Sequence, residues 1–229
     1  MPKANSTDIN IVLDRSSSMD PLRDTTIAGF NEFILTQRMT PGDARCSLLT
    51  FSDTYALVYD AIPLADVPIL SRANYEPGGW TALWDSLAFL IDRAGERLAA
   101  MVEVERPAKV VFLILTDGEE NISKKYKGEP GRHALKKKVE HQRSKYSWEF
   151  VYIGANGDAM LASERLGMNP RNALNYKADI RGMQGAMRMT SAGTSRYRGG
   201  AAPSGGYFVG LDPDAPSVVV PSSGKADSK

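Results

Sequence analysis

The chain has 229 residues, and its 42% hydrophobic content suffices to bury one sizeable core but seldom two. Its longest aliphatic and aromatic run, residues 110–115, is far shorter than the ~20 residues that cross a bilayer, so the sequence predicts no membrane span. The net charge is +1, but residues 1–120 carry 10 Lys and Arg against 18 Asp and Glu, whereas residues 121–229 carry 18 against 9.

The start of the chain and its cysteine content favour a cytoplasmic location. Residues 1–8 lack the apolar stretch of a secretory signal. The single cysteine, Cys46, has no partner for an internal disulfide, which fits a reducing compartment. Cys46 lies inside an apolar segment, so we expect a packed core thiol rather than a nucleophile.

The first part of the chain alternates short apolar runs with a longer helical pattern, as is typical of an α/β fold. Residues 9–13 are mostly β-branched, which predicts a central strand buried on both faces of a parallel sheet. Asp20 followed by Pro21 predicts the start of a helix of about 17 residues, because a carboxylate can cap a helix and proline presets its first φ. Residues 45–51 and 55–59 predict two strands, and their short link permits only an antiparallel hairpin.

The second part of the chain continues the alternation. Residues 81–101 repeat apolar side chains at steps of three and four, which predicts an amphipathic helix. In the last predicted helix, Met183 and Met187 are expected to face inward as core filler. In chain order, the further elements are a strand at 109–115, a helix at 134–146, a strand at 148–154, a short helix at 158–166, an edge strand at 173–177 and a closing helix at 179–190.

The composition changes near residue 191 to Gly, Ala, Ser and Pro with few large apolar residues. Such a segment cannot bury enough surface to offset the entropy of ordering it. We therefore expect a short N-terminal lead over residues 1–6, one domain over residues 7–190 and a flexible tail over residues 191–229. Two apolar patches in the tail, residues 207–209 and 218–220, are exceptions that would suit docking.

Polar side chains suited to metal binding follow three of the predicted elements. Asp14, Ser16 and Ser18 come directly after the first strand, Thr81 opens a helix after paired glycines, and Asp117 follows the strand at 109–115. In open α/β sheets ligands bind outside the carboxyl ends of the strands. The sequence therefore predicts that these five side chains converge at one edge of the sheet.

The chemistry of these candidate ligands favours Mg²⁺, or Mn²⁺. All of them offer oxygen, few are charged, and no His or Cys lies nearby, so zinc is disfavoured. Each segment alone has an ordinary interpretation, because Asp-x-Ser-x-Ser can form a capped turn and Asp-Gly a simple turn. The order of the segments and their placement at strand ends favour a metal site.

The combination resembles the metal-ion-dependent adhesion site (MIDAS) of von Willebrand factor type A (vWA) domains, over about residues 7–190. Neighbouring motifs at residues 29–33, 82–85 and 150–156 are similar to bacterial and phage members. One departure is Ser17, which stands where glycine is common and bears on metal affinity. By the resemblance, Ser16 and Ser18 would bind the metal directly, Asp14 and Asp117 mainly through water, and Thr81 directly or through water.

The resemblance also implies a fold and a mode of action. The fold would be α/β, a doubly wound and mostly parallel six-stranded sheet with strand order 3-2-1-4-5-6, one antiparallel edge strand and helices on both faces. The function would be a metal-dependent protein-binding module, in which a protein partner presents an Asp or Glu to the bound Mg²⁺. Trp80, Glu119 and Glu120 are expected at the partner-binding rim, Trp80 as an apolar anchor and the glutamates discouraging highly acidic partners.

Two other functions stay open. A Mg²⁺-dependent hydrolase or phosphoryl-transfer enzyme would use the same carboxylates. However, Ser16 stands where an aspartyl-nucleophile phosphatase has its second acid, and His133 and His141 are expected away from the strand ends, so we expect no catalysis. A nucleic-acid-associated factor would use the basic C-terminal half, although its Lys and Arg residues are scattered along the sequence.

Overall fold

Six strands form one sheet in the order β3-β2-β1-β4-β5-β6 in the computed structural model, which describes residues 1–155, 157, 159–200, 206–212 and 214. The pair β2–β3 is antiparallel and the other neighbours are parallel. This confirms the predicted α/β fold, its strand order and its antiparallel edge. The strands are β1 (Lys3–Asp14), β2 (Asp43–Phe51), β3 (Tyr55–Pro63), β4 (Pro107–Thr116), β5 (Glu149–Ala155) and β6 (Ala173–Tyr176).

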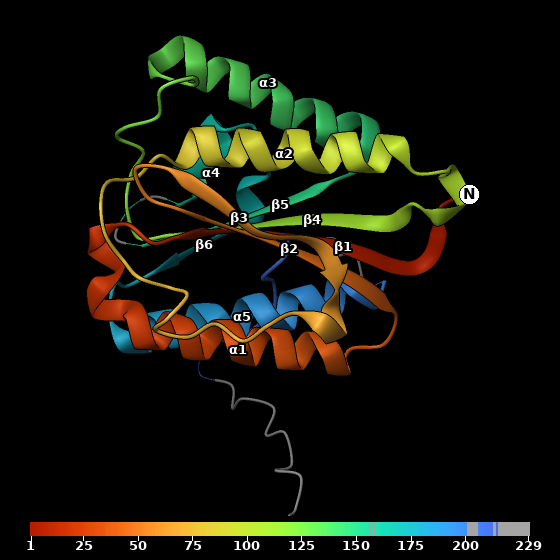
Figure 1. Ribbon diagram of the computed structural model, residues 1–229, viewed down its shortest axis with the longest axis horizontal. Helices are drawn as coiled ribbons and strands as arrows, with labels where there is room; N and C mark the ends of the chain where they lie inside the picture. Colours follow the sequence, from red (N-terminus) through yellow and green to blue (C-terminus); the bar gives the residue numbers. More distant parts are fainter. Residues whose placement is uncertain (156, 158, 201–205, 213, 215–229) are drawn as a thin grey trace, which may run out of the picture.

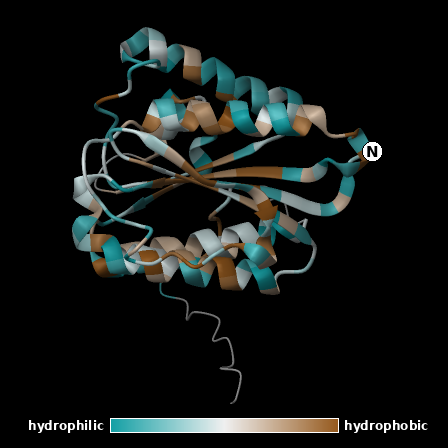
Figure 2. Ribbon diagram, viewed as in Figure 1, coloured by the Kyte–Doolittle hydropathy of each residue, from teal (hydrophilic) through white to brown (hydrophobic). Residues whose placement is uncertain are grey.

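Helices cover both faces of the sheet, as Figure 1 shows. On one face lie α2 (Leu83–Ala100), α3 (Gly128–Tyr146) and α4 (Ala159–Arg165), and on the other lie α1 (Arg23–Met39) and α5 (Ile180–Arg198). Apolar residues concentrate on the strands between these layers, whereas the outer helix α3 is largely hydrophilic (Figure 2). None of the helices in the described part of the chain combines the length and apolarity that crossing a bilayer requires.

The central strand β1 divides the core into two clusters. Successive side chains of a strand point to opposite faces, so Ile11 and Leu13 pack with the α1 and α5 layer and Val12 packs with the α2 layer. Cys46 is fully buried in the first cluster. A strand that is covered on both faces holds its carboxyl end in a fixed position, and this end carries Asp14.

Several element boundaries differ from the sequence-based expectation. Strand β1 begins at Lys3, which pairs with Pro107, so most of the expected N-terminal lead belongs to the sheet. Asp20 and Pro21 lie within a short 3-10 helix, Ser17–Leu22, that precedes α1. Asp20 therefore does not cap α1.

The expected flexible tail is wrong for the residues that continue α5. This helix runs to Arg198 rather than ending near residue 190, and Thr194 is buried. Beyond it, the buried Tyr207 donates a hydrogen bond from its hydroxyl to Thr194 Oγ1 at 2.6 Å. A Cβ on Gly193 would lie 2.6 Å from the Tyr207 ring, so the small residues that suggested disorder instead permit close packing. Residues 201–205, 213 and 215–229, including the patch at 218–220, lie outside the described residues.

Candidate metal site

Three loops meet at the edge of the sheet where β1 and β4 end. The loop after β1 and the loop before α2 are joined by two backbone hydrogen bonds, from Ser17 N to Gly79 O at 3.0 Å and from Gly78 N to Arg15 O at 2.8 Å. Strands β1 and β4 are parallel neighbours, so their carboxyl ends lie side by side. The fold therefore brings the predicted segments together.

Four of the five candidate ligands form a continuous chain of hydrogen bonds. Ser18 Oγ donates to Asp117 Oδ1 at 2.6 Å, and the hydroxyl oxygens of Ser16 and Ser18 lie 3.1 Å apart. Asp14 Oδ1 accepts from the backbone N–H of Ser16 at 2.7 Å. Two carboxylates and two hydroxyls thus share one small volume, although Asp14 and Asp117 are 103 positions apart.

The fifth candidate, Thr81, lies beside this cluster. A Cβ on Gly118 would lie 3.4 Å from Thr81 Oγ1 and 3.8 Å from Ser18 Oγ, so both hydroxyls flank Gly118. The backbone of Thr81 is held on both sides by Asn121, whose side-chain oxygen accepts from Thr81 N at 2.9 Å and whose N–H donates to Thr81 O at 3.1 Å. Sequence reasoning missed Asn121, because no local pattern marks this pairing.

Two further residues that sequence reasoning did not assign hold Asp14 in place. Thr116 donates a 2.6 Å hydrogen bond from Oγ1 to Asp14 Oδ2, and the buried Tyr75 donates one of 2.6 Å to the Asp14 carbonyl. Both Asp14 carboxylate oxygens therefore have a partner within the protein. This agrees with a carboxylate that supports a metal site from behind rather than standing free in solvent.

The electrostatics of the cluster favour a cation. Burial raises the pKa of the Asp14 carboxyl from its ordinary value of 3.8 to about 6, and the neighbouring Asp117 carboxylate adds to the rise, while hydrogen bonds from Thr116 and Ser16 oppose it. Burial also raises the pKa of Asp117. Within the described residues, neither carboxylate forms an ion pair with Lys, Arg or His. A bound cation would offset this uncompensated charge.

The donor set fits a hard metal ion. It consists of carboxylate and hydroxyl oxygens and contains neither His nor Cys, the ligands that softer ions prefer. The described part of the chain holds no group of three or more His, Cys, Asp and Glu side chains that could bind a metal, so the hydroxyls would have to complete the ligand set. Few charged ligands leave room for water in the coordination sphere, as Mg²⁺ requires. The residues present are therefore compatible with Mg²⁺ or Mn²⁺.

The three expected rim residues have different surroundings. The Trp80 side chain is 63% exposed beside Thr81, and Glu119 is also exposed. Glu120 is turned inward, since its carboxylate accepts hydrogen bonds from the backbone N–H groups of Trp84 at 2.8 Å and Ile122 at 2.9 Å. Glu120 therefore anchors a loop on α2 and does not present a free charge at the rim.

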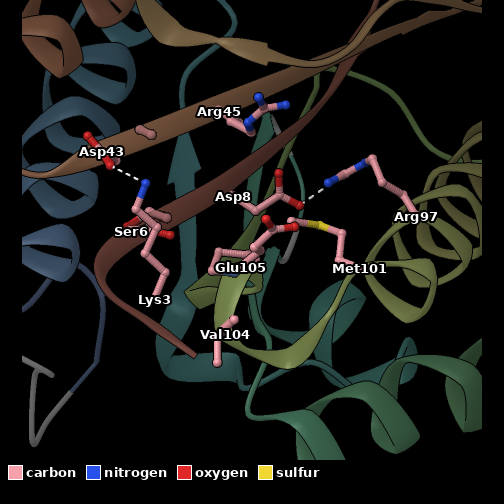
Figure 3. A pocket seen from close by; sticks show the side chains of 12 residues that line it. Lys3, Ser6, Asp8, Asp43, Arg45, Arg97, Met101, Val104 and Glu105 are labelled. Carbon is pink, nitrogen blue, oxygen red and sulfur yellow. Dashed lines mark hydrogen bonds and ion pairs between the residues drawn. The ribbon is translucent and has the colours of Figure 1, made fainter. Parts of the chain in front are cut away.

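Other polar groups lie away from this cluster. His133 and His141 are exposed on the outer helix α3. A cavity of about 730 Å³ lies around the amino-terminal part of β1, and Figure 3 shows Asp8 and Arg97 facing each other there. Asp8 Oδ2 forms an ion pair of 2.9 Å with Arg97, whereas the buried Asp8 Oδ1 has no hydrogen-bond partner among the described residues.

The sheet order and the hydroxyl–carboxylate cluster define a doubly wound α/β domain with a candidate metal site at its strand ends. The family model described as von Willebrand factor type A domain matches residues 8–183, and the chain belongs to that family. Domains of this family are typically MIDAS-dependent adhesion or interaction modules and are usually not catalytic. No curated protein sequence matches the chain.

Solved structures share this fold at low identity. The mussel byssus proximal thread matrix protein 1, in a structure with a zinc-occupied MIDAS motif, has a TM-score of 0.58 at 15% identity, covering 82% of this chain and 48% of that one. A von Willebrand factor type A protein from Catenulispora acidiphila has a TM-score of 0.53 at 15% identity, covering 83% and 42%. The chain thus spans less than half the length of these proteins. At such identity the likeness establishes the fold alone.

Proposed function

We propose that this domain binds one Mg²⁺ or Mn²⁺ and uses it to bind a protein partner that presents an Asp or Glu. The observation that carries the proposal is the convergence of two carboxylates without ion-pair partners and two mutually hydrogen-bonded serine hydroxyls at the carboxyl ends of β1 and β4. Asp14, Ser16, Ser18, Thr81 and Asp117 would hold the ion. The bound ion would supply an open position for a carboxylate oxygen.

The oxygen-only donor set supports a choice among metals. Zinc occupies the MIDAS motif in the mussel byssus structure, which supports metal binding by this fold. In the present chain the hydroxyl and carboxylate ligands suit Mg²⁺ and Mn²⁺ better than Zn²⁺, which prefers His and Cys. We therefore expect Mg²⁺ to be the ion in the cell, because a site of few oxygen ligands binds weakly and is filled by whichever hard divalent cation is abundant.

The surface beside the site suits binding rather than catalysis. Trp80 would form an apolar anchor for the partner, since aromatic side chains next to a binding centre often dominate affinity. No described histidine lies at the strand ends, because both occur on α3, so no imidazole is placed there to act as a general base for hydrolysis. A binding module therefore accounts for the site with fewer assumptions than an enzyme does.

Titration calorimetry with Mg²⁺ and Mn²⁺ tests the metal assignment. We expect one ion per chain, and we expect Asp14→Ala and Asp117→Ala each to weaken binding at least about tenfold, as loss of a ligand or its supporting group commonly does. Trp80→Ala is the matched control at the same loop and should leave metal affinity unchanged. Unchanged affinity in both aspartate variants, with the fold retained by circular dichroism, would refute the assignment.

A further inference from the structure

Two carboxylates hold the loop between β4 and α3 against the start of α2: Glu120 in the loop and Asp85 on the helix. Neither side chain is an N-cap in the usual position; instead both reach across to the neighbouring element. These hydrogen bonds satisfy most backbone N–H groups of the loop. They also hold the loop in one conformation, so a partner would not have to order it on binding. Glu120 accepts from the N–H groups of Trp84, Ile122 and Ser123, and Asp85 accepts from those of Lys124, Lys125 and Tyr126.

The same bonds turn the acidic groups inward and leave basic groups outside. Lys124 and Lys127 are exposed, and within the described part of the chain neither forms an ion pair. Both line a cavity of about 670 Å³, whose other walls include the half-buried Trp84, Asn121, Ile122 and Glu120, the last with its carboxylate held by internal hydrogen bonds. The cavity therefore combines an apolar wall with two cations.

This cavity adjoins the candidate metal site. Asn121 lines the cavity and also holds Thr81 through two backbone contacts of 2.9 and 3.1 Å. The three residue steps from Asn121 to Lys124 span at most about 10 Å, at roughly 3.3–3.6 Å per extended residue. A partner segment that passes Asn121 would need only three or four further residues to reach Lys124.

We infer that this cavity is a second contact for the protein partner and selects an acidic side chain within about four residues of the carboxylate at the metal. The inference rests on the proposed function and names the chemistry of the partner. It reverses the sequence-based expectation that Glu119 and Glu120 disfavour acidic partners. The Glu120 carboxylate accepts four internal hydrogen bonds that partly offset its charge, so the exposed groups of this loop beside the cavity are Glu119 against Lys124 and Lys127.

Synthetic peptides test this inference with the full chain. Three fluorescein-labelled Gly/Ser peptides carry one Asp, followed at the next few positions by Ser only, by Glu or by Lys. Fluorescence anisotropy in Mg²⁺ should give the Glu peptide roughly fivefold tighter binding than the Ser peptide, since two exposed ion pairs contribute modestly. The Lys peptide should bind most weakly, and raising the ionic strength should reduce the preference.

Charge-reversed variants show whether the preference comes from the cavity. Lys124→Glu with Lys127→Glu should abolish or reverse it while leaving the Ser peptide unaffected. The control pair, Lys137→Glu with Lys145→Glu, makes the same net change on exposed positions of α3 and should retain it. Equal binding of the three peptides in Mg²⁺, lost in chelator, overturns this inference but not the proposed function.

Two other outcomes are decisive. If none of the peptides binds in a Mg²⁺-dependent manner, both the proposed function and this inference fail. If a single-stranded oligothymidylate binds through Lys124 and Lys127 while the Glu peptide gains nothing over the Ser peptide, the cavity serves nucleic acid and the acidic partner is wrong.

Discussion

At the residue scale, Asp14 is costly to the fold when no metal is bound. Its side chain is fully buried, and burial with the nearby Asp117 raises its pKa to about 6. A group whose pKa is raised on folding stabilises the folded state below its ordinary pKa, and that stabilisation is lost as the pH rises through the folded value. A carboxylate buried at such a cost is typical of a metal ligand or of a residue that supports one.

Comparison of Asp14→Asn with the original chain in chelator tests this cost. Between about pH 4 and pH 6 the original chain should lose up to about 3 kcal/mol of unfolding free energy relative to the variant, because a shift of about two pKa units corresponds to that amount. Above about pH 7 the difference should stay constant. Urea unfolding at a series of pH values measures it, and a difference that does not change with pH would contradict the raised pKa.

At the element scale, the last turns of α5 close one face of the molecule on α1. Arg198 is buried and donates to the backbone carbonyls of Thr40 at 3.2 Å and Gly42 at 2.8 Å. Gln37 on α1 donates from Nε2 to Ser191 O at 3.0 Å. Arg198 also donates to Gln37 O at 2.5 Å, in the last turn of α1. A guanidinium suits this position, because the last carbonyls of a helix lack partners within it and carry the negative end of its dipole.

Truncation after residue 190 should therefore destabilise the domain. It removes Arg198 and the buried Thr194, and several buried hydrogen bonds at about 1 kcal/mol or more each are lost with them. Arg198→Met should alone cost about 2 kcal/mol, and the exposed Arg181→Met at the start of the same helix should cost little. Thermal unfolding of the three variants checks this, and an unchanged midpoint after truncation would restore the flexible-tail prediction.

At the scale of the whole molecule, local pattern predicted the sheet but not the connections between loops. The strands and the antiparallel hairpin followed from buried apolar runs and a short link, because both are set by neighbours in sequence. The strand order was implied by the resemblance to vWA domains. The inward turn of Glu120 and the support of Thr81 by Asn121 depend on where two loops meet, and no periodicity encodes that. The packing of Tyr207 was missed because a composition rich in small residues is typical of disordered segments. In the folded chain the same small size lets the Tyr207 ring pack directly on Gly193.

The same long-range assembly makes metal binding a property of the folded state. The candidate ligands come from the end of β1, the start of α2 and the end of β4, so the unfolded chain should hold Mg²⁺ only weakly. A ligand that binds only the folded state stabilises it by about 2.7 kcal/mol at a hundred times its dissociation constant.

We therefore expect saturating Mg²⁺ to raise the thermal midpoint of the full chain by roughly 5–10 °C over its value in chelator, at about 2–4 °C per kcal/mol for a domain of this size. Asp117→Ala should stay folded and show no such shift, because it lacks one of the carboxylates that would hold the ion. Trp80→Ala should shift like the original chain, since its exposed ring lies beside the site without binding the ion. Circular dichroism melts of the three proteins make the measurement. An equal shift in Asp117→Ala would place the stabilising Mg²⁺ elsewhere on the molecule.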